Sequence, residues 1–351
     1  MSLRRSAAAL ARVNVTSMQV RPRVHLFLDF DGTLCTTDTM HLLGRVPDAR
    51  DVRRCQSDRT SLTQHKLASS ADTWKLFGES YMKDYTVYQS TNLPGEPDHA
   101  AYSRYLAGLR DIEMRSVHRV RAAGFFAGID EPDVVTVAKT AILSGEIQFS
   151  SGSAELFDMF DEKGANSLPC GSEVAILSVN WSAVLIRSLV SGMTTPADER
   201  HIREEGSYGE DSSGECALQR PKWTTVANEI EELRSAEKGN PSSMLEIRTA
   251  PDKLREMQSM LAARQNPSLV VYVGDSATDY ECLRAADIGI WLCNVPETKF
   301  KRQYLRVFMP LEDIPVPIGQ SRAHSGNASW LWAQNLGQVA RYLREGYSGD
   351  E

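Results

Sequence analysis

The 351-residue sequence lacks several features that mark particular classes of protein. No apolar run approaches the roughly 18 residues that a membrane-spanning helix needs. Basic residues are not in excess, because Lys and Arg total 39 against 46 for Asp and Glu, and the formal net charge of −7 argues against general nucleic-acid binding. The six cysteines are scattered without a C-x-x-C pair or a Cys/His spacing, which excludes a disulfide framework and a structural zinc site.

What remains is an ordinary globular composition, with 42% hydrophobic and 24% charged residues. The length favours about two domains, and we expect a soluble, intracellular protein with neither a nucleic-acid nor a membrane partner. The acid-free, Arg-rich segment 1–23 has the composition of a mitochondrial transit peptide, or equally of a disordered tail. The expected location is therefore cytoplasmic or mitochondrial, and the oligomeric state stays open.

After an apolar, β-prone run at 24–28, the spacing of apolar residues changes twice along the chain. Residues 39–149 have mainly helical spacing of apolar residues, whereas strand-like and helix-like segments alternate from 150 onward. This pattern predicts an α/β core, formed by 24–38 and 150–351, with a helical cap of 39–149 inserted. Residues 198–220, rich in acids, Gly and Ser, are interpreted as a disordered insertion.

The alternation predicts individual elements as well. Beyond the first run, strands are expected at 174–177, 224–227, 269–273 and 288–292, and helices at 71–85, 102–120, 133–143, 153–162, 181–189, 251–264 and 278–286. A last amphipathic stretch, 330–343, is expected to pack on the core.

Polar residues follow several predicted strands at the point where each strand ends. Asp29 and Asp31 come directly after the first strand, Ser178 follows the second, and Gly274–Asp279 (G-D-S-A-T-D) follows the fourth. The carboxyl ends of parallel strands lie at one edge of a sheet, where open α/β proteins form their binding crevice. These groups are therefore expected to meet there.

Taken singly, each of these residues has a structural interpretation. Asp31-Gly32 is typical of a hairpin turn, although no second alternating strand follows it. Ser178 and the aspartates after the fourth strand are of the residue types that cap helices. Lys253 lies in the first turn of a predicted helix, where most lysines are solvated and where a cation opposes the helix dipole. An anion nearby would explain this lysine.

Taken together, the carboxylates supply what phosphoryl transfer needs. Asp29 can attack phosphorus and form an aspartyl-phosphate. Asp31 can protonate the leaving alcohol and then take a proton from water. The negative charges of Asp29, Asp275 and Asp279 would repel a phosphate dianion, so a Mg²⁺ ion is expected among them.

The phosphoryl oxygens also need partners. Ser178 can donate a hydrogen bond to them, and Lys253 can neutralise their charge. Thr33 and Asn180 are further candidates for phosphate binding.

The order of these motifs resembles that of the haloacid dehalogenase (HAD) superfamily. The four matching motifs are Asp29–Thr33 (D-F-D-G-T), Ser178, Lys253 and Gly274–Asp279, and the resemblance covers about residues 24–292. It implies a Rossmann-like parallel sheet with an inserted helical cap of the C1 type, which closes over the site.

The resemblance also implies roles for the acids. An aspartate at the second position of the first motif, here Asp31, marks the phosphatase branch of the superfamily. Mg²⁺ is then bound by the Asp29 side chain, the Asp31 main-chain carbonyl and Asp275, with Asp279 in support.

Finer similarities point to a subgroup. Residues 225–229 and 247–253 resemble the phosphoserine-phosphatase-like subgroup, and 272–290 resemble its thiamin-monophosphate phosphatase domains. Asp38 stands where phosphoserine phosphatases hold the substrate amine, so it is a possible specificity residue, although it could equally cap a helix. Asn180-Trp181 replaces the glycines usual in phosphoserine phosphatases, which argues against phosphoserine itself.

Two features of the predicted cap remain open. Arg115, Arg119 and Arg121 form a basic patch that is either a solvated helix face or a site for an anionic substrate tail. Trp74, Phe77 and Tyr81 have helical spacing and are expected to pack the cap core.

The sequence therefore predicts a Mg²⁺-dependent phosphatase that acts on a small phosphorylated metabolite through phospho-Asp29. A phosphomutase or another HAD phosphotransferase is the alternative among enzymes. A catalytically weak scaffold or a receiver-like signalling module is the alternative from another class.

Overall fold

The computed structural model describes residues 22–58, 69–161, 167–194, 223–234, 246–264, 268–309, 311–320 and 329–345. The expected N-terminal segment lies outside these residues except for its last two, and the expected insertion at 198–220 lies outside them entirely.

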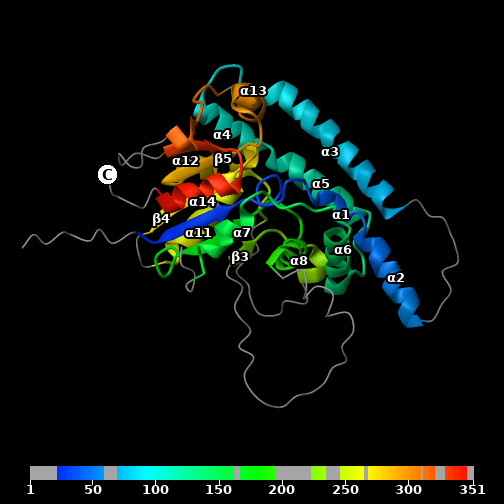
Figure 1. The fold of residues 1–351 in the computed structure, drawn as a ribbon. Helices are drawn as coiled ribbons and strands as arrows, with labels where there is room; N and C mark the ends of the chain where they lie inside the picture. The colour runs from blue at the N-terminus through cyan, green and yellow to red at the C-terminus, as the bar shows by residue number, and fades with distance from the viewer. Residues whose placement is uncertain are drawn as a thin grey trace, which may run out of the picture.

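A seven-stranded, fully parallel sheet forms the centre of the molecule (Figure 1). Its strand order is β3-β2-β1-β4-β5-β7-β6, and the order 3-2-1-4-5 of the first five strands is that of doubly wound nucleotide-binding folds. The predicted α/β class is confirmed. The strands are β1 (Val24–Leu28), β2 (Glu173–Leu177), β3 (Trp223–Val226), β4 (Leu269–Gly274), β5 (Ile288–Leu292), β6 (Val316–Pro317) and β7 (Ser329–Ala333).

The central position of β1 explains its composition. All five of its residues are buried, because helices cover both faces of a parallel sheet and such strands are almost continuously apolar. Leu28 is paired in register with Ile176 of β2 and with Val273 of β4. The residues that follow these three strands therefore emerge side by side at one edge of the sheet.

In the described part of the chain, six helices lie between β1 and α7, and Figure 1 shows them gathered to one side of the sheet; that they form a separate cap stays a prediction. They are α1 (Met40–Leu43), α2 (Val46–Asp58), α3 (Ser70–Asn92), α4 (His99–Gly108), α5 (Arg110–Ala122) and α6 (Glu131–Leu143).

The remaining helices alternate with the strands. They are α7 (Ser153–Asp158), α8 (Ala183–Thr194), α10 (Glu231–Arg234), α11 (Ala250–Ala262), α12 (Tyr280–Ala285), α13 (Glu297–Val307) and α14 (Leu336–Glu345), with 3₁₀ turns at Ala277–Asp279 and Ile318–Gln320. Within the described ranges, we find no helix with the length and apolar character that a membrane span requires.

Helix α4 fastens the inserted helices to the sheet domain. Tyr102 is buried in a cluster with Tyr280, and the two rings meet edge to face at 4.9 Å. The Tyr102 hydroxyl donates to the Val307 carbonyl at 3.2 Å, and at the start of α5 Arg110 pairs with the buried Asp252. Movement of the whole insertion as one body would break these contacts.

Candidate active site

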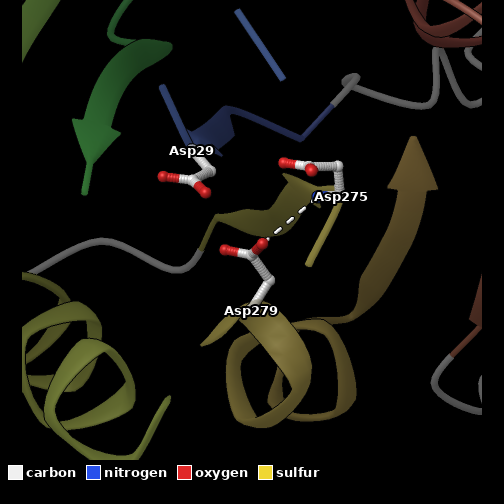
Figure 2. Close-up of side chains that lie close together, drawn as sticks. All are labelled: Asp29, Asp275 and Asp279. Atoms are coloured by element: carbon white, nitrogen blue, oxygen red, sulfur yellow. Dashed lines mark hydrogen bonds between the residues drawn. The ribbon is translucent and has the colours of Figure 1, made fainter. Parts of the chain in front are cut away.

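Three carboxylates meet at the carboxyl edge of the sheet. Asp29 follows β1, Asp275 follows β4, and Asp279 lies in the 3₁₀ turn that precedes α12. Figure 2 shows the three side chains directed toward a common space, and each offers an oxygen within 4.8 Å of the other two. Residues that are about 250 positions apart in the sequence thus form one cluster.

A fully buried lysine lies between two of these acids. Lys253 Nζ is 2.9 Å from Asp29 Oδ1 and 2.7 Å from Asp279 Oδ1. Thr249 and Asp252 form a capping box that fixes the start of α11, and so places Lys253 in its first turn. Burial alone would lower the pKa of Lys253, but the charges of Asp279 and Asp29 raise it above its ordinary value. The solvated-lysine interpretation is wrong.

The donor set suits a divalent cation. A single ammonium group leaves the three carboxylates under-neutralised, and burial together with the charge of Asp279 raises the pKa of Asp275 to about 7. Burial and the charge of Asp279 also raise the pKa of Asp29. Clustered carboxylate oxygens are donors that Mg²⁺ prefers, so the residues present fit this ion.

Asp279 also orders the surrounding loop. Its Oδ1 accepts hydrogen bonds from Lys253 and, at 2.7 Å, from the Tyr272 hydroxyl. Its Oδ2 accepts from the backbone N–H of Asp275 at 3.2 Å and from the N–H and hydroxyl of Ser276, both at 3.0 Å. With five donors, Asp279 positions its neighbours, and direct metal ligation by it stays a prediction. Sequence reasoning missed Tyr272, whose one signal is a hydroxyl in an aliphatic strand.

Residues of the loop after β1 contact the side chain of Asp275. Gly32 has φ +77°, and a Cβ there would lie 2.3 Å from Asp275 Oδ2. The Thr33 hydroxyl donates to Asp275 Oδ1 at 2.8 Å, and the Trp291 indole N–H donates to the Asp275 carbonyl at 2.8 Å. The Thr33 hydroxyl therefore binds the Asp275 carboxylate in this structure, and phosphate binding by Thr33 stays a prediction.

Both oxygens of Asp31 accept hydrogen bonds. Oδ1 accepts from the N–H and the hydroxyl of Thr39, both at 2.7 Å, and Oδ2 accepts from Asn180 Nδ2 at 2.8 Å. Burial raises the pKa of Asp31, and these hydrogen bonds oppose the rise. Thr39 was missed in the sequence, where nothing distinguishes it from the other threonines of this segment.

The segment after β2 is fixed by its own contacts. The Ser178 N–H donates to the Val226 carbonyl, and the Ser178 hydroxyl oxygen accepts from the Asn180 N–H at 3.2 Å. Asn180 Oδ1 accepts from the Ser182 N–H at 3.1 Å. The Asn180 amide is thus directed at Asp31, and phosphate binding by Ser178 and Asn180 stays a prediction.

Asp38 is not one of the three clustered carboxylates, but it lies close enough to Asp31 for its charge to act on that side chain. It is exposed, and its Oδ1 accepts a hydrogen bond from the Met40 N–H at 2.7 Å, at the start of α1. The N-cap of α1 is Thr39, so Asp38 accepts from the first N–H of the helix at the position before the cap. A role for Asp38 in substrate specificity stays a prediction.

The basic patch on α5 consists of ion-paired residues. Arg119 lies 2.6 Å and Arg115 3.9 Å from Asp84, whereas Arg121 lies 2.7 Å from Glu231. These arginines join α5 to α3 and to the core.

The aromatic residues that the sequence singled out in α3, at positions 74, 77 and 81, have different kinds of contact. Trp74 stacks on Phe125 at 5.4 Å and meets Trp181 of the core edge to face at 5.6 Å. Phe77 packs on Phe125 in the same cluster. The Tyr81 hydroxyl donates to Glu113. Trp74 therefore connects the helical insertion with the core segment that follows Asn180.

Comparisons with known proteins give distant likenesses. No protein-family model matches the chain. It is 24% identical over 290 residues to a CTO1 family protein of Schizosaccharomyces pombe, covering 82% of this chain and 86% of that protein. It is 25% identical over 318 residues to the "Bifunctional TH2 protein, mitochondrial" of Arabidopsis thaliana, covering 87% of this chain but only 45% of that protein. Among solved structures, it is similar to a HAD family hydrolase of Salmonella enterica serovar Typhi, with a TM-score of 0.37, 14% identity, and 83% and 73% of the two chains covered.

Proposed function

We propose that this chain is a HAD-type, Mg²⁺-dependent phosphatase that hydrolyses a small phosphorylated metabolite through an aspartyl-phosphate on Asp29. The observation that carries the proposal is the Asp29 carboxylate, which lies beside Lys253, Asp275 and Asp279 at the carboxyl edge of the central strand. Burying several carboxylates around a single lysine costs folding free energy. Such a cluster is therefore explained best by the cationic and anionic ligands that it binds.

The contacts of Asp29 indicate which oxygen attacks. Oδ1 accepts from the Phe30 N–H at 2.7 Å and lies against Lys253. No described residue donates to Oδ2, which is therefore the oxygen free to bond phosphorus. Lys253 lies 2.9 Å from Asp29 Oδ1 and can neutralise charge on the transferred phosphoryl group.

Asp31 acts as the general acid and then as the general base in the proposed reaction. Thr39 and Asn180 orient its carboxylate between the two steps. A bound Mg²⁺, held by Asp29, the Asp31 carbonyl and Asp275, supplies charge neutralisation for the phosphoryl oxygens. Ser178 is proposed to hydrogen-bond to the same oxygens, with Thr33 and Asn180 as further candidates.

The remaining expectations are part of the same proposal. Residues 39–149 serve as a cap over the site, the ligand is a phosphate ester rather than a nucleic acid or a membrane, and the subgroup is phosphoserine-phosphatase-like or thiamin-monophosphate-phosphatase-like. The location is cytoplasmic or mitochondrial, and the name of the Arabidopsis relative, which describes that protein as mitochondrial, supports the mitochondrial alternative.

The test is a screen of phosphorylated metabolites with and without Mg²⁺, combined with phosphoenzyme trapping in the wild type and in Asp29→Asn. We expect Mg²⁺-dependent release of phosphate and a trapped phosphoenzyme in the wild type, and neither in the variant. The Asn side chain keeps the shape of Asp29, so the fold should be retained. Turnover by Asp29→Asn at the wild-type rate would remove Asp29 from the mechanism, and an isomer in place of free phosphate would identify a mutase.

A further inference from the structure

Tyr272 is a fully buried tyrosine of β4 whose hydroxyl group reaches the acid cluster. The residue is 0% exposed. Val271 and Val273, its neighbours in the strand, belong to one hydrophobic cluster, whereas Tyr272 belongs to the other together with Met257 of α11 and Leu283 of α12. Successive side chains of a strand point to opposite faces of the sheet. Tyr272 therefore points to the side of the sheet on which α11 and α12 lie.

The Tyr272 hydroxyl and the Lys253 ammonium group share one acceptor. Each donates to Asp279 Oδ1 at 2.7 Å. Burial, followed by the charge of Asp279, raises the pKa of Tyr272 well above its ordinary value, so the phenol stays protonated and can donate. One carboxylate oxygen thus accepts from a neutral donor and from a charged donor.

Asp279 cannot turn away from these two donors. Its other oxygen, Oδ2, accepts from the N–H of Asp275 at 3.2 Å and from the N–H and the hydroxyl of Ser276, both at 3.0 Å. These hydrogen bonds hold Oδ1 facing Tyr272 and Lys253. A change at either of the two donors must therefore be taken up by the other.

Lys253 is also bound on its other side. Its Nζ lies 2.9 Å from Asp29 Oδ1, so the ammonium group stands between two carboxylates, and Asp279 is the nearer of them. An ammonium group has three protons, and two of them suffice for these partners. The third can bind an oxygen of a phosphoryl group on Asp29. This use depends on where Nζ lies between the two acids.

Asp279 is the acceptor of the Tyr272 hydroxyl even though other acidic groups lie nearby. Among the described residues, the groups whose charges act on this hydroxyl are Asp279, Cys282 and Asp29. Burial raises the pKa of the Cys282 thiol well above its ordinary value, so this group is uncharged. Asp29 is already paired with Lys253. The hydroxyl therefore acts on the lysine through the oxygen that the two share.

We propose that Tyr272 is a positioning residue for phosphoryl binding: by sharing Asp279 Oδ1 with Lys253, its hydroxyl keeps the ammonium group between Asp279 and Asp29. Without the phenol, the buried oxygen keeps only the ammonium donor, which the charge of Asp279 then draws away from Asp29. The inference rests on the phosphatase function proposed above, and it adds the group that adjusts the position of Lys253. A hydroxyl that only satisfied a buried acceptor would not affect the binding of phosphate.

The experiment measures the affinity for inorganic phosphate, the expected product, by calorimetry in the presence of Mg²⁺. Tyr272→Phe removes the hydroxyl and keeps the ring, so the packing of β4 should be retained. We expect the dissociation constant for phosphate to rise about three- to tenfold, because part of one charge-assisted hydrogen bond is passed on to the ligand. With the substrate that the metabolite screen identifies, kcat/KM should fall by a similar factor.

Tyr304→Phe is the matched control. Tyr304 is also 0% exposed, and its hydroxyl donates to the carbonyl and to Oδ1 of Asp313 at 3.1 and 3.2 Å, outside the acid cluster. Both variants should lower the melting temperature, but only Tyr272→Phe should weaken phosphate binding. The double variant Tyr272→Phe/Lys253→Met should bind phosphate no more weakly than Lys253→Met does, because Tyr272 acts through Lys253. The single variant and its control suffice if the double variant does not fold.

Calorimetry needs no turnover, so the two proposals can fail separately. Absence of hydrolysis of every phosphate ester would refute the phosphatase function, and the phosphate affinities would still decide the role of Tyr272. Equal affinities of the wild type and Tyr272→Phe, or an equal loss in Tyr304→Phe, would overturn the inference. A further loss in the double variant would overturn it as well, because the hydroxyl would then act without Lys253. A wild type that binds no phosphate would refute both proposals.

Discussion

The side-chain amide of Asn180 donates a 2.8 Å hydrogen bond to the carboxylate of Asp31, and this contact joins the segment after β2 to the segment after β1. Asn180 cannot rotate freely, because Ser182 donates to its Oδ1 and Asn228 donates to its carbonyl. The amide therefore selects one orientation of the carboxylate that the proposed reaction uses as acid and base.

Replacing Asn180 with alanine should slow the hydrolysis of alkyl phosphates by about 10- to 100-fold, because general acid catalysis is worth about 10²–10⁴ and only part of it depends on orientation. Hydrolysis of 4-nitrophenyl phosphate should fall much less at the phosphoryl-transfer step, since its leaving group needs no proton. Burst and steady-state kinetics on both esters measure the difference.

The double variant Asp31→Asn/Asn180→Ala supplies the control. If Asn180 acts through Asp31, the second substitution should add little to the first. Equal losses on both esters, or full additivity in the double variant, would mean that Asn180 has only a structural role.

Replacing Lys253 with methionine should destabilise the protein by about 3 kcal/mol in a buffer without divalent cations, because it leaves two buried carboxylates without their common counter-charge. Urea unfolding measures the change. Lys299→Met, at an exposed position of α13, should stay within about 0.5 kcal/mol of the wild type. A loss as small as that of the control would contradict the buried ion pair.

The sheet and the acid cluster could be predicted because both depend on local sequence signals. The apolar run 24–28 and the run 269–273 are strands that end where expected, within one residue. Parallel strands necessarily bring their carboxyl ends to one edge, so Asp29 and Asp275 had to lie near each other once the sheet was assumed. Lys253 was harder to assign, since its sequence context alone favours a solvated residue and its place in the first turn of a helix only suggests an anion nearby.

Other features depend on tertiary packing and left no clear signal. The helix expected at 102–120 is two helices, α4 and α5, which meet at Leu109, because Tyr102 packs on the core while the following turns cross toward α3. The amphipathic stretch at 330–343 begins as strand β7, because Trp330 and Trp332 pair with β5 before the helix starts. Apolar residues in a strand and in a helix are hard to separate by periodicity over so few residues.

The same limit applies to the hydrogen-bond partners in the site. Thr39 and Tyr272 are of common residue types at unremarkable spacings, and only the folded chain brings each against its neighbours. Sequence could therefore predict the charged groups of the site but not the residues that orient them.

Replacing Gly32 with alanine should abolish the effect of Mg²⁺ on thermal stability and reduce turnover by at least about tenfold. The new Cβ would lie 2.3 Å from Asp275 Oδ2 at a backbone φ of +77°, so either the loop or the carboxylate must move. Gly78→Ala is the contrasting variant, because nothing lies within 4 Å of a Cβ in this exposed part of α3. It should raise the free energy of unfolding by about 1 kcal/mol without affecting turnover. A Gly32→Ala enzyme with the wild-type response to Mg²⁺ would refute the packing of Gly32 against Asp275.

The pKa of Asp275 determines how stability should depend on pH. Burial and the charge of Asp279 raise this pKa from 3.8 to about 7, so the native state retains a proton that the unfolded chain has already lost. Without a divalent cation, the contribution of this group to stability should therefore fall as the pH rises from about 4 to about 7 and stay constant above that range. Mg²⁺ binds the ionised carboxylate and competes with the proton below this pKa. We thus expect Mg²⁺ to raise the melting temperature more at about pH 8 than at about pH 5.5, with EDTA samples as the reference at each pH. Asp275→Asn, which cannot ionise, should reduce the difference between the two pH values, and any remainder would come from Asp29, whose pKa is raised by burial and by the charge of Asp279 as well. An equal shift at both, or a variant that keeps the wild-type difference, would show that Asp275 is not the group that exchanges a proton for the metal.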